Sequence, residues 1–209
     1  MDAARPELIS DDALDDLERE AIGRVRGRVL EIGAGEGENF GAFDHDVEWI
    51  GLEPDAGRRA ELAVRAREWG HRSEVLDAVA ERIPLPDASV DAVVGTYVLC
   101  SVDDQAAALA EVRRVLRPGG RVVFVDHVVA PPRTFKRALQ RAVTPISARF
   151  CHNCHWDRDT GRALADAGFA GDHVRLVRVP SFPLGPTRVL VFGGHVTDAA
   201  GSSATGERP

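Results

Sequence analysis

Residues 29–40 read VLEIGAGEGENF, and this stretch decides the fold. Its first half predicts a strand over Arg28 to Ile32, and its end predicts a short helix over Glu38 to Phe43. The turn between them has the pattern G-x-G-x-G. It differs from the dinucleotide pattern G-x-G-x-x-G because the sixth residue counted from Gly33 is an acid. The Glu36 carboxylate also competes with a phosphate for the backbone N–H groups at the helix start, so the turn predicts a cationic or zwitterionic ligand.

S-adenosylmethionine suits such a turn, because it carries a sulfonium and an amino acid group in place of phosphates, and its approach to the backbone needs residues without side chains. Glu53 lies 22 positions after Glu31, where an acid can accept hydrogen bonds from both ribose hydroxyls. Asp77 and Ala78 end the next strand, where an acid can accept from the adenine amino group and a backbone N–H can serve a ring nitrogen. Each feature alone is equally typical of a tight turn or a polar strand end, but their order predicts a nucleoside-like cofactor.

Strands and helices alternate along the chain up to residue 128. Strands are expected at 28–32, 48–53, 75–76, 90–98 and 121–128, and helices at 11–24, 38–43, 55–69 and 103–117. Such an alternation forms a parallel sheet that binds ligands at the carboxyl ends of its strands. Two further strands, at 174–179 and 188–196, predict an antiparallel closing pair. The predicted fold is α/β: a doubly wound, mostly parallel, seven-stranded Rossmann-like sheet with an antiparallel closing strand.

The length of 209 residues predicts one domain over 28–196, with an acidic helix in 1–27 packed on it and a disordered polar tail over 197–209. A net charge of -7 argues against nucleic acid as a partner. Three cysteines and the lack of an apolar signal sequence predict a cytoplasmic protein without a disulfide framework. The longest apolar or neutral run, Ala92 to Val102, is shorter than the ~18 residues of a membrane span, so no integral membrane segment is expected.

Four stretches of the first 128 residues resemble the successive motifs of class I S-adenosylmethionine-dependent methyltransferases. They are VLEIGAGEGENF, GLEPD, VLDAVAERIPLPDASVDAVVGTYVLCSV and EVRRVLRPGGRVVFVDHV. The resemblance implies that residues 28–196 form a methyltransferase domain that transfers a methyl group from S-adenosylmethionine. It implies cofactor contacts by Glu31, Gly33, Ala34, Gly35, Gly37, Glu53, Pro54, Asp77, Ala78 and the backbone near Thr96.

Motifs from residue 98 onward resemble the methyltransferase-like 7 group, whose animal members methylate small alkyl thiols. They are VLCSV at 98–102, DHV at 126–128, CHWDRDT at 154–160 and PLGP at 183–186. The group's usual pattern has Glu, Gly and Leu where this chain has Asp126, Asn153 and Trp156. The resemblance implies a small, lipophilic methyl acceptor, with an alkyl thiol favoured. A quinone, a phenol or a lipid amine is the alternative acceptor, and a non-catalytic regulatory protein that binds the cofactor is the alternative of another class.

Methyl transfer to a thiol needs a group that helps the thiol to ionise. His127, at the end of the fifth strand, is the first candidate for the base, and His155 is the second. A hydrogen bond to a loop carbonyl is the alternative role of His127, and a packing role is the alternative for His155. Cys100 is expected to be a small buried residue near the pocket.

The segment CHNCH at 151–155 contains residue types that ligate zinc. Cys151, His152, Cys154 and His155 crowd into five positions and lack a distant second pair, so a loop that lines the acceptor pocket is expected rather than a metal site. The basic segment from Arg133 to Arg149 predicts an amphipathic lid helix. Peripheral contact with anionic lipid is the alternative for that helix. The sequence indicates no oligomeric state.

Overall fold

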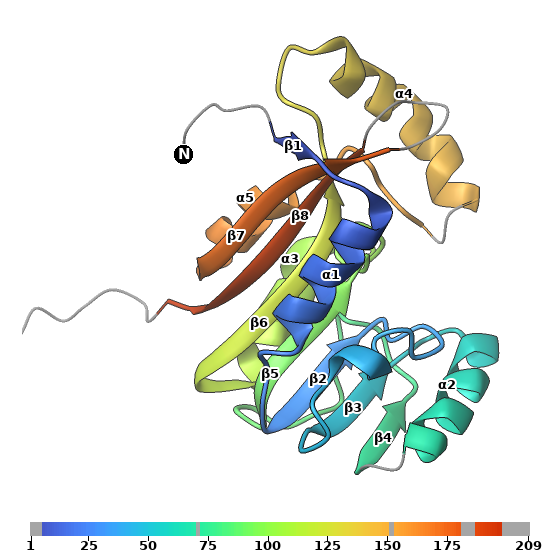
Figure 1. The fold of residues 1–209 in the computed structure, drawn as a ribbon, viewed down its shortest axis with the longest axis vertical. Coiled ribbons are helices and arrows are strands. Elements are labelled where there is room, and N and C mark those ends of the chain that lie inside the picture. Colours follow the sequence, from blue (N-terminus) through green and yellow to red (C-terminus); the bar gives the residue numbers. More distant parts are fainter. Residues whose placement is uncertain (1–5, 70–71, 151–152, 181–186, 198–209) are drawn as a thin grey trace, which may run out of the picture.

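The computed structural model describes residues 6–69, 72–150, 153–180 and 187–197. Its centre is one sheet of eight strands in the order β1-β7-β8-β6-β5-β2-β3-β4 (Figure 1). The strands are β1 (Glu7–Leu8), β2 (Arg28–Ile32), β3 (Glu48–Leu52), β4 (Ser73–Leu76), β5 (Val90–Thr96), β6 (Leu116–Val128), β7 (Phe169–Val179) and β8 (Thr187–Val196). Strands β2 to β6 pair in parallel, and β8 is antiparallel to β6 and β7. The predicted α/β sheet with an antiparallel closing strand is confirmed.

The sequence predicts seven strands, and the additional one is β1. Its two residues pair in parallel with Val177 and Arg178 of β7, and the Arg178 Nε atom donates to the Pro6 carbonyl at 2.7 Å. Two residues are too few for an alternation of apolar and polar side chains to appear in the sequence. The count is therefore corrected to eight strands in the described part of the chain.

Helices cover both faces of the sheet. They are α1 (Asp11–Ile22), the 3₁₀ turn η1 (Phe40–Ala42), α2 (Ala56–Trp69), α3 (Gln105–Val115), α4 (Phe135–Phe150) and α5 (Thr160–Asp166). In β2, Val29 packs in the same core cluster as Ile22 of α1 and Leu62 of α2, whereas Leu30 packs with Leu109 of α3. Because successive residues of a strand point to opposite faces, β2 is apolar on both, as is typical of a covered parallel sheet.

Helix α1 packs on the part of the sheet formed by β6, β7 and β8. Ser10 caps it, since the Ser10 hydroxyl oxygen accepts a hydrogen bond from the Ala13 N–H at 3.3 Å. Leu14 is buried against Val125 and Val177 of the sheet. Most acidic residues of the helix are exposed to solvent, whereas Glu18 is only partly exposed.

Helix α3 is shorter than the sequence predicts at both of its ends. The helix expected at 103–117 begins at Gln105, because the Asp104 carboxylate accepts from the N–H groups of the first turn, and it ends at Val115, because Leu116 already pairs with Val90 in the sheet. In the basic segment, the Thr144-Pro145 pair does not interrupt the helix, and α4 continues to Phe150. The Thr144 hydroxyl donates to the Gln140 carbonyl at 2.9 Å, inside the helix.

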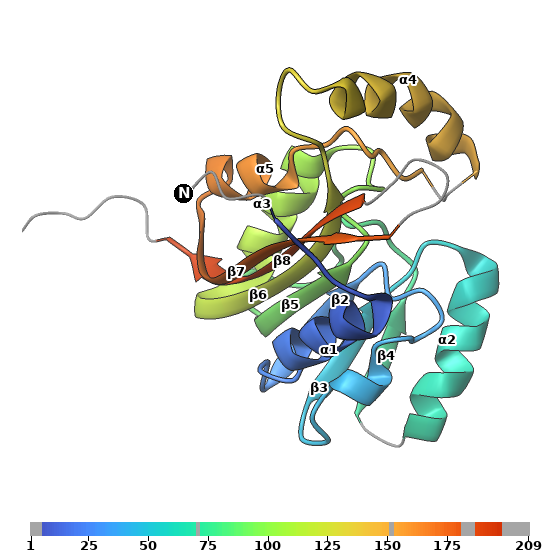
Figure 2. The ribbon, with the colours of Figure 1, turned by 45° about the horizontal axis from the view of Figure 1, so that its top comes forward.

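Helix α4 follows β6 and lies beyond the carboxyl ends of the parallel strands (Figure 2). Phe135, at its first position, is 84% exposed. None of the described helices is long and apolar enough to cross a membrane. Of the predicted tail, all but Thr197 lies outside the described residues.

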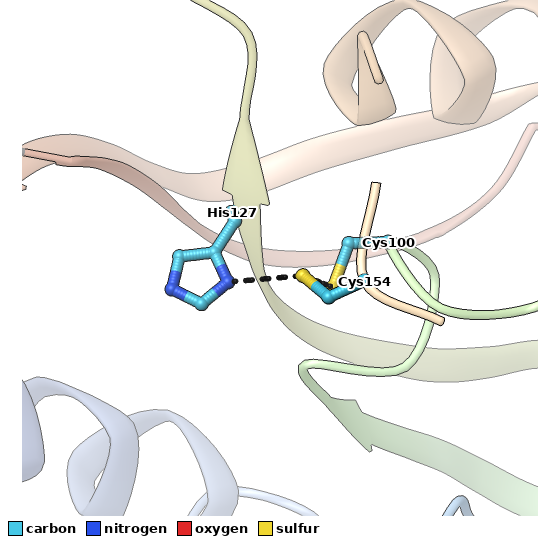
Figure 3. A group of neighbouring side chains, drawn as sticks. All are labelled: Cys100, His127 and Cys154. Carbon is cyan, nitrogen blue, oxygen red and sulfur yellow. Dashed lines mark hydrogen bonds between the residues drawn. The ribbon is translucent and has the colours of Figure 1, made fainter. Parts of the chain in front are cut away.

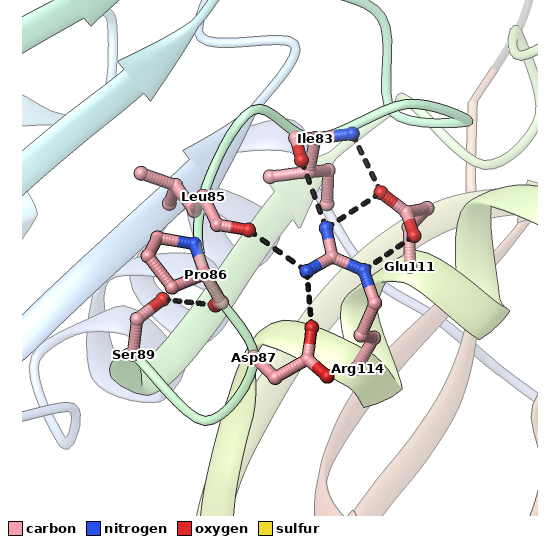
Figure 4. A network of polar contacts seen from close by, with 7 residues as sticks. All are labelled: Ile83, Leu85, Pro86, Asp87, Ser89, Glu111 and Arg114. Atoms are coloured by element: carbon pink, nitrogen blue, oxygen red, sulfur yellow. Dashed lines mark hydrogen bonds and ion pairs between the residues drawn. The ribbon is translucent and has the colours of Figure 1, made fainter.

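The loop between β4 and β5 is fixed to α3 by one arginine (Figure 4). The Arg114 guanidinium donates to the carbonyls of Ile83 and Leu85, each at 2.8 Å, and to the carboxylates of Asp87 and Glu111. The Ile83 N–H donates in turn to Glu111 at 2.8 Å. The hydrogen bonds from Arg114 hold the pKa of Glu111 below its usual value. This network anchors the same loop that carries residues 78–81 to the carboxyl edge of the sheet.

Candidate active site

A cavity of about 770 Å³ lies at the carboxyl ends of β2, β3, β5 and β6. Its volume is within the range of about 300–1,000 Å³ that is usual for small-molecule sites. Seven residues expected to contact the cofactor line it: Gly33, Ala34, Gly35, Glu53, Pro54, Ala78 and Thr96. Ligands of open α/β sheets bind at this edge, so the position of the cavity follows from the topology.

The glycine turn after β2 forms one wall. Gly33 has φ +61° and Gly35 has φ +57°, in the left-handed region that favours glycine. A Cβ atom on Gly33 would lie 2.7 Å from the Val98 side chain, so that position has no room for one. The conformation and packing of the turn therefore require glycine, and its backbone lines the cavity.

Glu53 connects the turn with the end of β3. Its side chain is buried, and its two carboxylate oxygens accept hydrogen bonds from the Gly35 N–H and the Asp55 N–H, each at 2.9 Å. These bonds hold the carboxylate at the cavity wall. A carboxylate in this position suits the ribose hydroxyls of the cofactor.

Three other residues of the expected cofactor set lie behind or beside the cavity. Gly37 packs against the Phe40 ring. Asp77 has a side chain that is 69% exposed, and its carboxylate pairs with Arg59 at 2.9 Å. Glu31 is buried and accepts hydrogen bonds from Asn39 at 2.6 Å and from the Trp49 indole at 2.8 Å. The structure therefore places Glu31 as a support of the turn.

We expect Glu31 to make stability fall with rising pH. Burial raises the pKa of Glu31 from 4.5 to about 7. Between these pH values the folded protein keeps a proton that the unfolded chain has lost, so raising the pH favours unfolding. Urea unfolding from pH 4.5 to pH 7 should show wild type losing stability relative to Glu31→Gln. Glu68→Gln, at an exposed position of α2, is the control, and a constant difference between wild type and Glu31→Gln would contradict the prediction.

The structure adds cavity residues that sequence reasoning missed. Tyr97 lies directly after β5, has φ +56°, and donates through its hydroxyl to Glu18 of α1 at 2.6 Å. Burial raises the pKa of Glu18, although the Tyr97 hydrogen bond acts in the opposite direction. Asn39 donates to the Thr96 hydroxyl at 2.9 Å. Tyr97 and Asn39 could have been predicted, because Tyr97 directly follows a strand and Asn39 follows the glycine turn. Glu18 could not, because its place at the cavity depends on how α1 packs on the sheet.

The two histidine candidates are placed differently. His127 lies near the end of β6 and lines the cavity, and its ring packs against Tyr97 with the ring centroids 4.9 Å apart. His155 is not among the residues that line the cavity. Its Nε2 atom lies 3.2 Å from Asn153 Oδ1, and its backbone N–H donates to the Cys100 carbonyl at 2.8 Å. Of the CHNCH segment, Cys151 and His152 lie outside the described residues, as does the PLGP motif.

Cys100 and Cys154 meet beside His127 (Figure 3). The two sulfur atoms are 3.5 Å apart, and Cys154 Sγ is 3.7 Å from His127 Nδ1. The hydrogen bond with Cys154 and burial raise the pKa of Cys100 to about 12. Behind Cys100, the buried Asp126 carboxyl accepts from the Cys100 N–H at 3.0 Å. Burial raises the pKa of Asp126 well above its usual value.

Comparisons with known proteins agree with this geometry. Residues 30–124 match the family model described as a methyltransferase domain. The human thiol S-methyltransferase TMT1B is 30% identical over 198 residues, which cover 90% of this chain and 79% of that protein. A phosphatidylethanolamine N-methyltransferase of Cereibacter sphaeroides is 29% identical over 170 residues, which cover 79% of this chain and 78% of that protein. The solved structure of geranyl diphosphate methyltransferase in complex with S-adenosylmethionine has a TM-score of 0.70 at 20% identity. The match covers 90% of this chain and 86% of that structure.

The chain belongs to the class I S-adenosylmethionine-dependent methyltransferases, and its cofactor is S-adenosylmethionine. Within that family it resembles the methyltransferase-like 7 group, which the similarity to TMT1B confirms. It is an enzyme that methylates small molecules.

Proposed function

We propose that the protein transfers a methyl group to the sulfur of a small, lipophilic alkyl thiol. The observation that carries this proposal is a single cavity lined by the glycine turn at Gly33 and Gly35, by His127 and by the apolar side chains of Val98, Val102 and Trp156. The apolar side chains there suit an alkyl chain. The similarity to a thiol S-methyltransferase supports a thiol as the reacting group.

The cofactor would be held by the backbone at Gly33 and Gly35 and by the Glu53 carboxylate, which suits the ribose hydroxyls. Ala78 and the end of β5 at Thr96 would contact the rest of the nucleoside. When bound, S-adenosylmethionine supplies an electrophilic methyl group on a sulfonium. The chain's own task is then to hold the acceptor's sulfur in line with that group at contact distance.

His127 would promote ionisation of the acceptor. A cysteine-like thiol has a pKa of about 8.5, and a simple alkyl thiol has a higher one, so the acceptor is mostly protonated at pH 7, whereas the thiolate is the nucleophile. The His127 ring lies on the cavity wall and can take up the thiol proton. His155 would act on the acceptor only through the loop that it shares with Cys154, since its ring meets Asn153.

A second acceptor class is favoured by the charges of the cavity. Acidic side chains that line it are Glu18, Glu36, Glu38, Glu53, Asp55, Glu81 and Asp103. Such a wall attracts cations. An amine acceptor is therefore the competing candidate, in line with the similarity to a phosphatidylethanolamine N-methyltransferase.

Purified protein with S-adenosylmethionine carrying a labelled methyl group separates these acceptors. A matched panel would contain alkyl thiols, amines and phenols of equal chain length, with products identified by mass spectrometry. We expect S-methyl products, with kcat/KM rising with the length of the alkyl chain. Preferential labelling of amines or phenols would overturn the thiol assignment, and the absence of any labelled product would place the acceptor outside these three classes.

A further inference from the structure

Three metal-ligand atoms converge at the acceptor end of the cavity (Figure 3). Cys100 follows β5, His127 is near the end of β6, and Cys154 lies in the loop before α5. The sulfur atoms are 3.5 Å apart, Cys154 Sγ is 3.7 Å from His127 Nδ1, and all three atoms lie within 4.8 Å of one another. The described chain brings no other group of three or more His, Cys, Asp or Glu residues together in this way.

Two of the three separations match those between ligands of a tetrahedral zinc site. With Zn–S bonds of about 2.3 Å and Zn–N bonds of about 2.0–2.1 Å, neighbouring sulfurs lie about 3.8 Å apart, and a sulfur and a nitrogen lie about 3.6 Å apart. The observed distances of 3.5 Å and 3.7 Å therefore need only small adjustments. Two thiolates and an imidazole form a donor set that selects zinc and similar thiophilic ions.

The surrounding groups fix the ligands in place. The Cys100 backbone is held at both its N–H, by Asp126 at 3.0 Å, and its carbonyl, by the His155 N–H at 2.8 Å. The Tyr97 ring packs against the imidazole of His127. Asp126 Oδ2 is buried and makes no hydrogen bond with any of the described residues. A carboxyl oxygen behind a ligand is typical of the outer groups that support metal sites.

We propose that Cys100, His127 and Cys154 bind a thiophilic divalent metal ion of the zinc class, with the fourth coordination position open to the cavity. His127 and Cys154 line the cavity and Cys100 is buried behind them, so the remaining position is on the cavity side. Three protein ligands and one open position are typical of catalytic zinc.

The role of the open position rests on the proposed function. It takes the sulfur of the acceptor thiol, the ion lowers the pKa of that thiol, and the released proton goes to solvent. With the ion bound, His127 holds the ion instead of taking up the proton. The acceptor then meets the cofactor as a metal-held thiolate.

Cobalt is the probe for the site itself. The reduced full-length protein, stripped of metal with a chelator, is titrated with Co²⁺ without oxygen. We expect one Co²⁺ per chain, with the visible absorption of a tetrahedral ion and a near-ultraviolet thiolate-to-cobalt charge-transfer band. Competition with Zn²⁺ should remove both signals. Absence of the charge-transfer band would overturn the proposal. So would protein that is isolated with a Cys100–Cys154 disulfide and binds no metal once that disulfide is reduced.

Matched variants locate the ligands. Cys100→Ser and Cys154→Ser should each weaken the charge-transfer band and the affinity for Co²⁺, and His127→Ala should weaken the affinity. Cys151→Ser and His155→Ala are the controls from the neighbouring CHNCH segment, and both should keep the band. Cofactor affinity, measured by calorimetry, reports whether each variant is folded. Loss of the band in Cys151→Ser would contradict an open fourth position.

Acceptor binding gives a separate readout. Adding an alkyl thiol to the cobalt protein should shift the charge-transfer band, and an alcohol of equal length should not. An unchanged spectrum, or metal-free protein that methylates the thiol at the full rate, would overturn the metal's role while leaving thiol methylation intact. A cobalt protein with the expected spectrum but no activity on thiols would instead refute the proposed function alone.

Discussion

In metal-free protein, His127→Ala is expected to lower kcat/KM for an alkyl thiol by about 10²–10⁴-fold at pH 7, the usual range for loss of a general base. The reason is the position of its ring on the cavity wall, beside Tyr97 and Cys154. The loss should shrink as the pH rises toward the acceptor's own pKa, which is above the value of about 8.5 for a cysteine thiol, because the acceptor then ionises without help.

The measurement is a pH profile of kcat/KM for wild type and variant. His173→Ala, at an exposed position of β7 away from this cavity, is the matched control and should follow the wild-type profile. Equal rates for wild type and His127→Ala at neutral pH would exclude a role for this histidine in forming the thiolate.

Glu53→Gln is expected to weaken cofactor binding by about 1–3 kcal/mol, or about 5–150-fold in Kd. The change removes the charge from a buried carboxylate that accepts from the Gly35 and Asp55 N–H groups. It also places an amide N–H where one of those donors points, so the turn loses a hydrogen bond as well as a partner for the ribose.

Calorimetric titration with S-adenosylmethionine measures this effect. Glu48→Gln is the control, because Glu48 begins the same strand at its opposite end and pairs there with Arg28 at the surface. A Kd that is the same for wild type and Glu53→Gln would remove the assignment of Glu53 to the ribose.

The part of the fold that sequence could predict is the part governed by local patterns. The apolar run of β2, the glycines after it and the acid at the end of β3 appear in the sequence in the order in which they meet in space. Burial on both faces is visible in β2 because its apolar residues are consecutive. Strand β1 is not visible, because its place depends on pairing with residues about 170 positions further along, at Val177 and Arg178.

The same distinction applies to the site. The glycine turn and Glu53 are local features, whereas Cys100, His127 and Cys154 come from three separated segments and have no ligand spacing that a motif could express. The sequence pattern points to the CHNCH segment as the alternative metal site because those residues are neighbours in the chain. In the folded protein, the His155 ring contacts Asn153. Cys154 instead contacts His127 of β6 and Cys100 in the turn after β5.

The position of β8 between β6 and β7 has a consequence for synthesis of the protein. When the ribosome has released the first five parallel strands, β6 is the open edge of the sheet, and it is 13 residues long. Its partner is not translated until residues 187–196. A long unpaired edge recruits other chains, so nascent molecules and products of premature stop codons should depend on chaperones at this stage.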